Sequence, residues 1–160
     1  MNNFDTAFLH LIGVEGEYTS GIDGDSKNDP GGETKYGICK RAYPAEDIPH
    51  MTLDRAKMIY KRDYWDLVKG DSLPSPLDSL VFDCAVNQGV DTAIKLLQKT
   101  LSVAQDGIVG ADTMRKASEA GKEVCALYLA DRAMRYTGTR NFDKFGRGWM
   151  KRLFVLAMEI

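Results

Sequence analysis

Residues 15 to 38 read EGEYTSGIDGDSKNDPGGETKYGI, an acidic, glycine-rich stretch directly after an apolar segment. Hydrolysis of a glycosidic bond needs one carboxyl group that stays protonated near neutral pH and a second group across the scissile bond. Glu15 suits the first role, because an apolar helical stripe and the negative end of a helix dipole both raise the pKa of a carboxyl group. We therefore predict that Glu15 is a proton donor.

The second group is expected from the loop that follows. Asp29 precedes a proline and two glycines at residues 30 to 32. The glycines let the backbone approach a sugar closely, and the proline fixes how the chain leaves the carboxylate. Asp29 is therefore the predicted partner of the acid, with Thr34 and Tyr36 orienting water or substrate hydroxyl groups.

The stretch allows two other interpretations. Residues 23 to 34 begin like a calcium loop, but Lys27, Asn28 and Thr34 occupy positions where a ligand, a glycine and a bidentate glutamate are needed. The stretch could also be a plain connector that follows an exposed Glu15. A glutamate at the helix end where the dipole disfavours its charge, followed by several glycines and a proline, indicates a functional loop and not a plain connector. No metal or other cofactor is predicted.

The elements that must position these groups are mainly helical. Phe4, Phe8, Leu11 and Glu15 recur at helical spacing, so the sequence predicts a first helix with Glu15 at the end of its apolar face. Thr34, Tyr36 and Ile38 alternate, which predicts a short strand or hairpin. Later helices are expected at residues 52 to 70, 75 to 89, 91 to 101, 111 to 120, 122 to 136 and 146 to 159.

Apolar spacing also predicts which helical residues are buried. In the second helix, capped by Thr52, these are Leu53, Ala56, Tyr60, Tyr64 and Leu67. In the third helix, which should be central, they are Leu77, Leu80, Val81, Cys84 and Ala85. The cysteines at 39, 84 and 125 are too far apart for a disulfide framework, so they are predicted to be small core residues.

Four later residues could meet a substrate. Trp65 could stack on a sugar ring, although its spacing also suits the core. Asn87 could reach the substrate or serve the end of its helix. Arg147 and Arg152 could contact the glycan, whereas Trp149 is in phase with apolar neighbours and is predicted to pack.

Charge is distributed unevenly along the chain. Residues 1 to 114 hold 18 acidic and 11 basic side chains, whereas residues 115 to 160 hold 5 and 10. The basic segment could meet a polyanion or form a solvated helix face. No signature of a nucleic-acid-binding motif, serine hydrolase elbow or phosphate loop accompanies it, so no nucleic acid partner is predicted.

Two segments resemble the motifs of a known family: EGEY at Glu15 to Tyr18 and DPGGETKYGI at Asp29 to Ile38. They are similar to the motifs EGGY and DPGGxTxxGI of glycoside hydrolase family 108, which contains phage and bacterial N-acetylmuramidases. The helices that follow in that family are similar to MTLDRAKMIYKRDYW and VFDCAVNQG in this sequence. Its C-terminal peptidoglycan-binding region is similar to QDGIVGADT and FGRGWMKR. The likeness covers about residues 4 to 156.

The resemblance implies a mainly α, lysozyme-like fold with a short β-hairpin or irregular glycine-rich loop after the first helix. It places the catalytic glutamate on Glu15, the loop aspartate on Asp29, and substrate contacts near Tyr18. It implies a catalytic lobe at residues 1 to 104 and a helical, peptidoglycan-binding-like lobe at 105 to 160 packed on it, with one compact domain as the alternative. One departure is Glu17 in place of a motif glycine, where a like charge could raise the pKa of Glu15 further or compete for its role.

The expected activity is cleavage of the β-1,4 bond between N-acetylmuramic acid and N-acetylglucosamine. A lytic transglycosylase and a non-catalytic peptidoglycan-binding module are the alternatives. No signal peptide or membrane span is visible in the sequence. By resemblance, we expect a monomeric endolysin, made in the host cytoplasm, released through a separate holin-like pore and acting on peptidoglycan in the periplasm.

Overall fold

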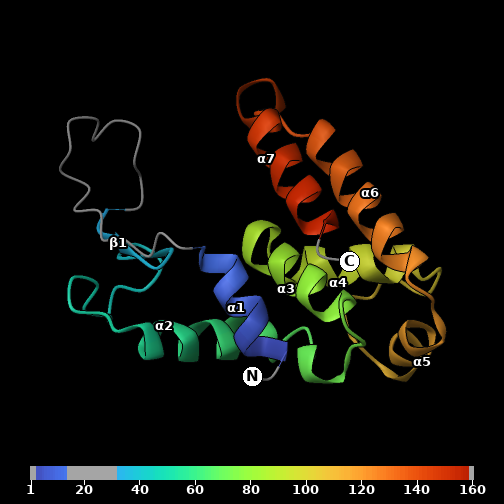
Figure 1. The fold of residues 1–160 in the computed structure, drawn as a ribbon, viewed down its shortest axis with the longest axis horizontal. Helices are drawn as coiled ribbons and strands as arrows, with labels where there is room; N and C mark the ends of the chain where they lie inside the picture. The colour runs from blue at the N-terminus through green and yellow to red at the C-terminus, as the bar shows by residue number, and fades with distance from the viewer. Residues whose placement is uncertain (1–2, 14–31, 159–160) are drawn as a thin grey trace. The chain divides into compact units, whose positions relative to one another are not determined.

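The computed structural model describes residues 3–13 and 32–158. These residues form seven α-helices and one two-stranded antiparallel sheet (Figure 1). The prediction of a mainly helical chain with a hairpin after the first helix is confirmed. The chain forms two compact units, Met1–Asp63 and Tyr64–Ile160. Helices on either side of residue 104 lie within the second unit, and the division of function between 1–104 and 105–160 stays a prediction.

The first helix, α1 (Asn3–Ile12), buries Phe4, Ala7 and Phe8 as its spacing predicts. The ring of Phe8 lies 5.5 Å from the ring of Tyr60. The helix ends at Ile12, and Gly13 follows with a φ of 64°, the left-handed conformation in which glycine ends helices. The helix α1 thus ends before Gly13, and the predicted place of Glu15 on its apolar face lies outside the described residues.

The hairpin consists of β1 (Thr34–Lys35) and β2 (Ile38–Cys39), with Thr34 opposite Cys39 and Lys35 opposite Ile38. Tyr36 and Gly37 connect the strands with φ values of 51° and 75°. Positive φ at both central residues is the pattern of a two-residue hairpin turn that matches the twist of its strands. The alternation of Thr34, Tyr36 and Ile38 suggests a strand position for Tyr36, but this residue lies in the turn.

The second helix changes its pitch partway along. Thr52 caps α2 (Leu53–Tyr60), its hydroxyl accepting from the Arg55 amide at 3.1 Å, and a π-helical turn, Lys61–Trp65, continues the helix. A π turn adds one residue per turn and shifts the buried face by one position. Trp65 and Val68 are therefore fully buried, while Leu67 is exposed and Tyr64 is only partly buried. Leu53, at the first turn, is also exposed, against expectation.

The second unit is built around α3 (Leu77–Gln88), which packs against α4 (Val90–Thr100) and α6 (Glu123–Thr137). All five predicted core residues of α3 are buried. Two further helices complete the unit: α5 (Ala111–Glu119) and α7 (Phe142–Ala157), the latter packing along α6 (Figure 1). A short 3-10 helix, Gly70–Ser72, precedes α3.

The last helix begins four residues before the predicted start at Gly146. Gly146 lies inside α7 and is buried beside the ring of Phe142. A Cβ at this position would stand only 2.7 Å from a ring carbon of Phe142, so the site suits glycine. Trp149 is partly buried and stacks on Tyr136 with ring centroids 5.0 Å apart, which confirms the packing prediction. Among the described helices, none has both the length and the apolarity to cross a bilayer.

The three cysteines are unpaired, as expected. Cys84 and Cys125 are buried, which confirms their prediction as core residues, whereas Cys39 in β2 is only partly buried. Burial raises the pKa of the Cys84 thiol. It also raises that of Cys125.

Candidate functional site

The predicted site residues fall into three groups. Glu15, Tyr18 and Asp29 lie outside the described residues. Thr34 and Tyr36 lie on one hairpin of the first unit. The other two, Trp65 and Asn87, belong to the second unit.

The hairpin is held on α2 through its turn. The hydroxyl of Tyr60 donates to the backbone carbonyl of Tyr36 at 3.0 Å. A Cβ at Gly37 would stand 2.5 Å from that same hydroxyl, so only glycine permits the contact. Ile38 follows with 2% of its surface exposed. The KYGI segment therefore has a structural reason for its glycine and its isoleucine.

Thr34 lies at the start of the same hairpin. Its hydroxyl donates to the Gly32 carbonyl at 3.2 Å, and Gly32 has a φ of 69°. The threonine thus stabilises the backbone turn at the last glycine of the DPGG segment. Because a hydroxyl group also has two acceptor lone pairs, Thr34 can still accept a hydrogen bond from water or a sugar.

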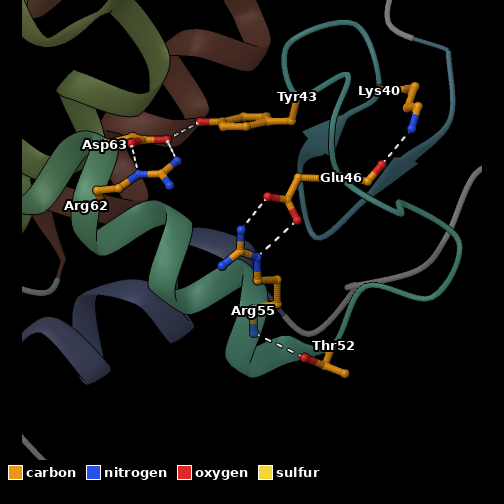
Figure 2. A network of polar contacts seen from close by, with 7 residues as sticks. All are labelled: Lys40, Tyr43, Glu46, Thr52, Arg55, Arg62 and Asp63. Carbon is orange, nitrogen blue, oxygen red and sulfur yellow. Dashed lines mark hydrogen bonds and ion pairs between the residues drawn. The ribbon is translucent and has the colours of Figure 1, made fainter.

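A polar network connects the loop after the hairpin to α2 and the π turn (Figure 2). Arg55 donates to both carboxylate oxygens of Glu46, at 3.0 and 2.5 Å. The hydroxyl of Tyr43 donates to Oδ2 of Asp63 at 3.0 Å, and Arg62 contacts the same carboxylate. Hydrogen bonds from Arg62, and also from Tyr43, lower the pKa of Asp63 against the opposing effect of burial. Sequence spacing did not reveal this network.

Changing Tyr43→Phe is expected to lower the free energy of unfolding by about 1 kcal/mol at neutral pH, the usual contribution of one hydrogen bond. Because the pKa of Asp63 is lowered on folding, its interactions stabilise the protein above the unfolded pKa and are lost as pH falls through the folded pKa. The difference between wild type and variant should therefore shrink in acid. Denaturant unfolding followed by far-UV circular dichroism measures it.

A double-mutant cycle with Asp63→Ala provides the control. The two substitutions should be less than additive, because each removes the same hydrogen bond. Additive losses, or a difference that is independent of pH, would contradict the assigned contact.

Trp65 has no exposed surface. Its indole Nε1 donates to Oδ1 of Asp71 at 2.8 Å, and its ring meets Phe82 edge-on with centroids 5.5 Å apart. The backbone of Gly70 lies against the indole so closely that a Cβ there would overlap the ring. The indole therefore has no face available for a sugar, and the packing alternative describes Trp65. The π turn is the reason, since it rotates this residue into the core.

Asn87 is exposed in the last turn of α3. With its amide oriented to satisfy its neighbours, Oδ1 accepts from Nε and Nη2 of Arg152, both at 3.0 Å. Arg152 also donates to the Asp83 carboxylate, with Nε 3.0 Å from Oδ2. From the other side, Nη2 of Arg132 donates to Oδ1 of Asp83 at 2.8 Å. An arginine of α7 thus connects Asn87 to a buried ion pair.

The ion pair at Asp83 was missed by sequence reasoning. Asp83 is 4% exposed and Arg132 is fully buried. The available signal was one aspartate within the apolar segment LVFDCAV, because a charge on a buried helix face needs a partner. Nothing in the sequence pointed to Arg132 as that partner.

A second polar centre organises the QDGIVG loop. Gln98 is 1% exposed and donates to Oδ1 of Asp106 at 2.6 Å and to the carbonyl of Ile108 at 3.0 Å, while it accepts from the Gly107 amide at 2.9 Å. Beside the loop lies an open pocket of about 360 Å³, which Thr113 also lines.

Within the described part of the chain, no group of three or more His, Cys, Asp or Glu side chains could hold a metal ion.

Comparison with known proteins identifies the family. Residues 8–89 match the model of glycosyl hydrolase 108. Among solved structures, SagA of Brucella abortus is 30% identical with a TM-score of 0.83, and the match covers 98% of this chain and 92% of that one. This likeness confirms the predicted lysozyme-like fold class. No curated protein matches the chain. Because the family model spans just over half of the sequence, including the hairpin and α3, this chain belongs to glycosyl hydrolase family 108 and is a glycosidase.

Proposed function

We propose that this glycosidase hydrolyses the β-1,4 bond between N-acetylmuramic acid and N-acetylglucosamine in bacterial peptidoglycan. Membership of glycosyl hydrolase 108 is the observation that carries the proposal. The segments at Glu15 to Tyr18 and at Asp29 to Ile38 resemble the two motifs of that family. Glu15 is the proposed proton donor and Tyr18 a proposed substrate contact. Asp29 either stabilises the oxocarbenium-like centre or acts through a water molecule.

The hairpin supports this assignment by giving the motif a fixed end. Tyr36 is held at its carbonyl by Tyr60, and Thr34 is bonded to the backbone of Gly32. Catalytic groups on loops gain precision when the loop ends are anchored on rigid elements. We propose that Thr34 assists Asp29 and that the ring of Tyr36 contacts the sugar.

For residues 105 to 160 we propose a role in holding peptidoglycan. The pocket beside the QDGIVG loop and the excess of basic side chains after residue 114 support this role. We also propose that the protein acts as a monomeric endolysin in the periplasm, after synthesis in the host cytoplasm and release through a separate holin-like pore. The resemblance to phage muramidases supports this cellular role.

Digestion of purified peptidoglycan tests the reaction. Mass spectrometry of the products should show reducing N-acetylmuramic acid ends, because hydrolysis adds water to the cleaved bond. Products with 1,6-anhydro ends would contradict hydrolysis and establish a lytic transglycosylase. Binding to the wall without clearing of a suspension of permeabilised cells would contradict catalysis altogether.

A further inference from the structure

We propose that Asp83 and Arg152 orient the side-chain amide of Asn87 so that its Nδ2 group donates a hydrogen bond to an acceptor oxygen of the bound glycan. Arg152 and Asp83 are then positioning residues, and Asn87 makes the contact. This inference rests on the proposed function, since it concerns the glycan on which the enzyme acts.

The charges around Asp83 determine which end of the amide faces inward. One carboxylate is shared by two guanidinium groups, those of Arg132 and Arg152, so the cluster has a surplus of positive charge and of N–H donors. Within the described residues, Nε and Nη1 of the buried Arg132 have no hydrogen-bond partner. An amide beside such a cluster is more stable with its oxygen toward the cations. With the amide assigned in this orientation, Nε and Nη2 of Arg152 each lie 3.0 Å from Oδ1 of Asn87.

The orientation leaves the donor end of the amide for a ligand. Asn87 is exposed, and the side chain of Arg152 keeps 34% of its surface accessible. Two N–H groups of Nδ2 are therefore available beside a local excess of positive charge. A ligand group that matches this arrangement is an oxygen acceptor, either neutral or anionic. In a peptidoglycan strand these are the carbonyl of an N-acetyl group and the carboxylate of the lactyl ether.

Substitutions at Asn87 separate binding from stability. Asn87→Asp keeps an oxygen for Arg152 and neutralises the surplus charge, so the thermal unfolding midpoint should not fall. It removes the donor, however, so the Kd for glycan should rise. Asn87→Ala removes the donor without adding charge, and we expect a Kd increase of about threefold to tenfold, the value of one hydrogen bond. A purely structural role predicts an unchanged Kd for both variants.

The positioning role is tested with Arg152→Met, with Lys95→Met as the control. Lys95 lies on α4, before residue 105, and among the described residues it makes only an exposed ion pair with Asp91. Arg152→Met should raise the Kd, because the freed amide can turn its oxygen toward the ligand, and combining it with Asn87→Ala should add little. Lys95→Met should leave the Kd unchanged. A Kd equal to wild type in Arg152→Met would overturn the positioning role.

The affinity is measured by calorimetry on soluble glycan strands freed of their peptides, with each substitution made in a Glu15→Gln background to limit turnover. If the effect of Asn87→Ala disappears on N-deacetylated strands, the acceptor is the acetyl carbonyl. If the effect of Asn87→Ala persists on N-deacetylated strands but is absent on chitooligosaccharides, which lack the lactyl group, the acceptor is the lactyl carboxylate. If the Glu15→Gln parent and its Asn87→Ala derivative bind intact strands with equal Kd values, the inference is overturned and the proposed function is not. Failure of the strands to bind the parent protein overturns both the inference and the proposed function.

Discussion

Changing Glu15→Gln is expected to lower the rate of wall lysis by about 10²- to 10⁴-fold, the usual contribution of a positioned general acid. An amide has nearly the shape of a carboxyl group but cannot deliver a proton to the leaving oxygen. The fold should remain, because one polar side chain replaces another of similar size. Lysis of permeabilised cells, followed by turbidity, measures the loss, and circular dichroism confirms that the variant is folded.

Glu17→Gln and Glu33→Gln are the matched controls, since both remove a carboxylate from the same acidic stretch. Neither should approach the loss seen for Glu15→Gln. If Glu17→Gln abolished lysis while Glu15→Gln retained it, the proton donor would be Glu17. This comparison is informative because helical spacing points to Glu15, whereas α1 ends at Ile12, three positions before that residue.

Changing Asp83→Asn is expected to lower the free energy of unfolding by about 3 to 5 kcal/mol, the range for removing one partner of a buried ion pair. Arg132 is fully buried, so its charge would lose the carboxylate that accepts from Nη2 at 2.8 Å. The substitution removes charge and leaves the volume of the side chain nearly constant. The loss therefore reports the uncompensated guanidinium group and not a cavity.

Asp91→Asn provides the control for this experiment. Asp91 pairs with Lys95 on the surface of α4, where 70% of its side chain is exposed. Exposed pairs of this kind contribute no more than about 1 kcal/mol. Denaturant unfolding of the two variants should give clearly different midpoints. Similar losses would mean that the Asp83 pair contributes as little as a surface pair.

The sequence predicted the elements whose local signals agree with their packing. The Thr52 cap, the five buried positions of α3 and the hairpin were all foreseen, because each depends on residues within one short segment. The same holds for Phe4 and Phe8 on α1. Of the candidate site, these local signals could predict the hairpin that carries Thr34 and Tyr36.

Features that depend on contacts between distant segments were not foreseen. The partner of Asp83 lies 49 positions along the chain at Arg132, and no local pattern encodes that distance. A glycine is typical of a helix terminus, but Gly146 lies inside α7, where its missing side chain makes room for the ring of Phe142. The π turn displaced the predicted buried face of α2, since periodicity analysis assumes a constant pitch.

The burial of Trp65 by that π turn also decides what can be observed spectroscopically. The chain has two tryptophans, Trp65 in the core and Trp149 on α7, and both belong to the second unit. Intrinsic tryptophan emission therefore reports on residues 64 to 160, with one fluorophore in a dry interior and the other partly in water. The first unit contains no tryptophan, so melting of its hairpin would be followed with a tyrosine or backbone probe.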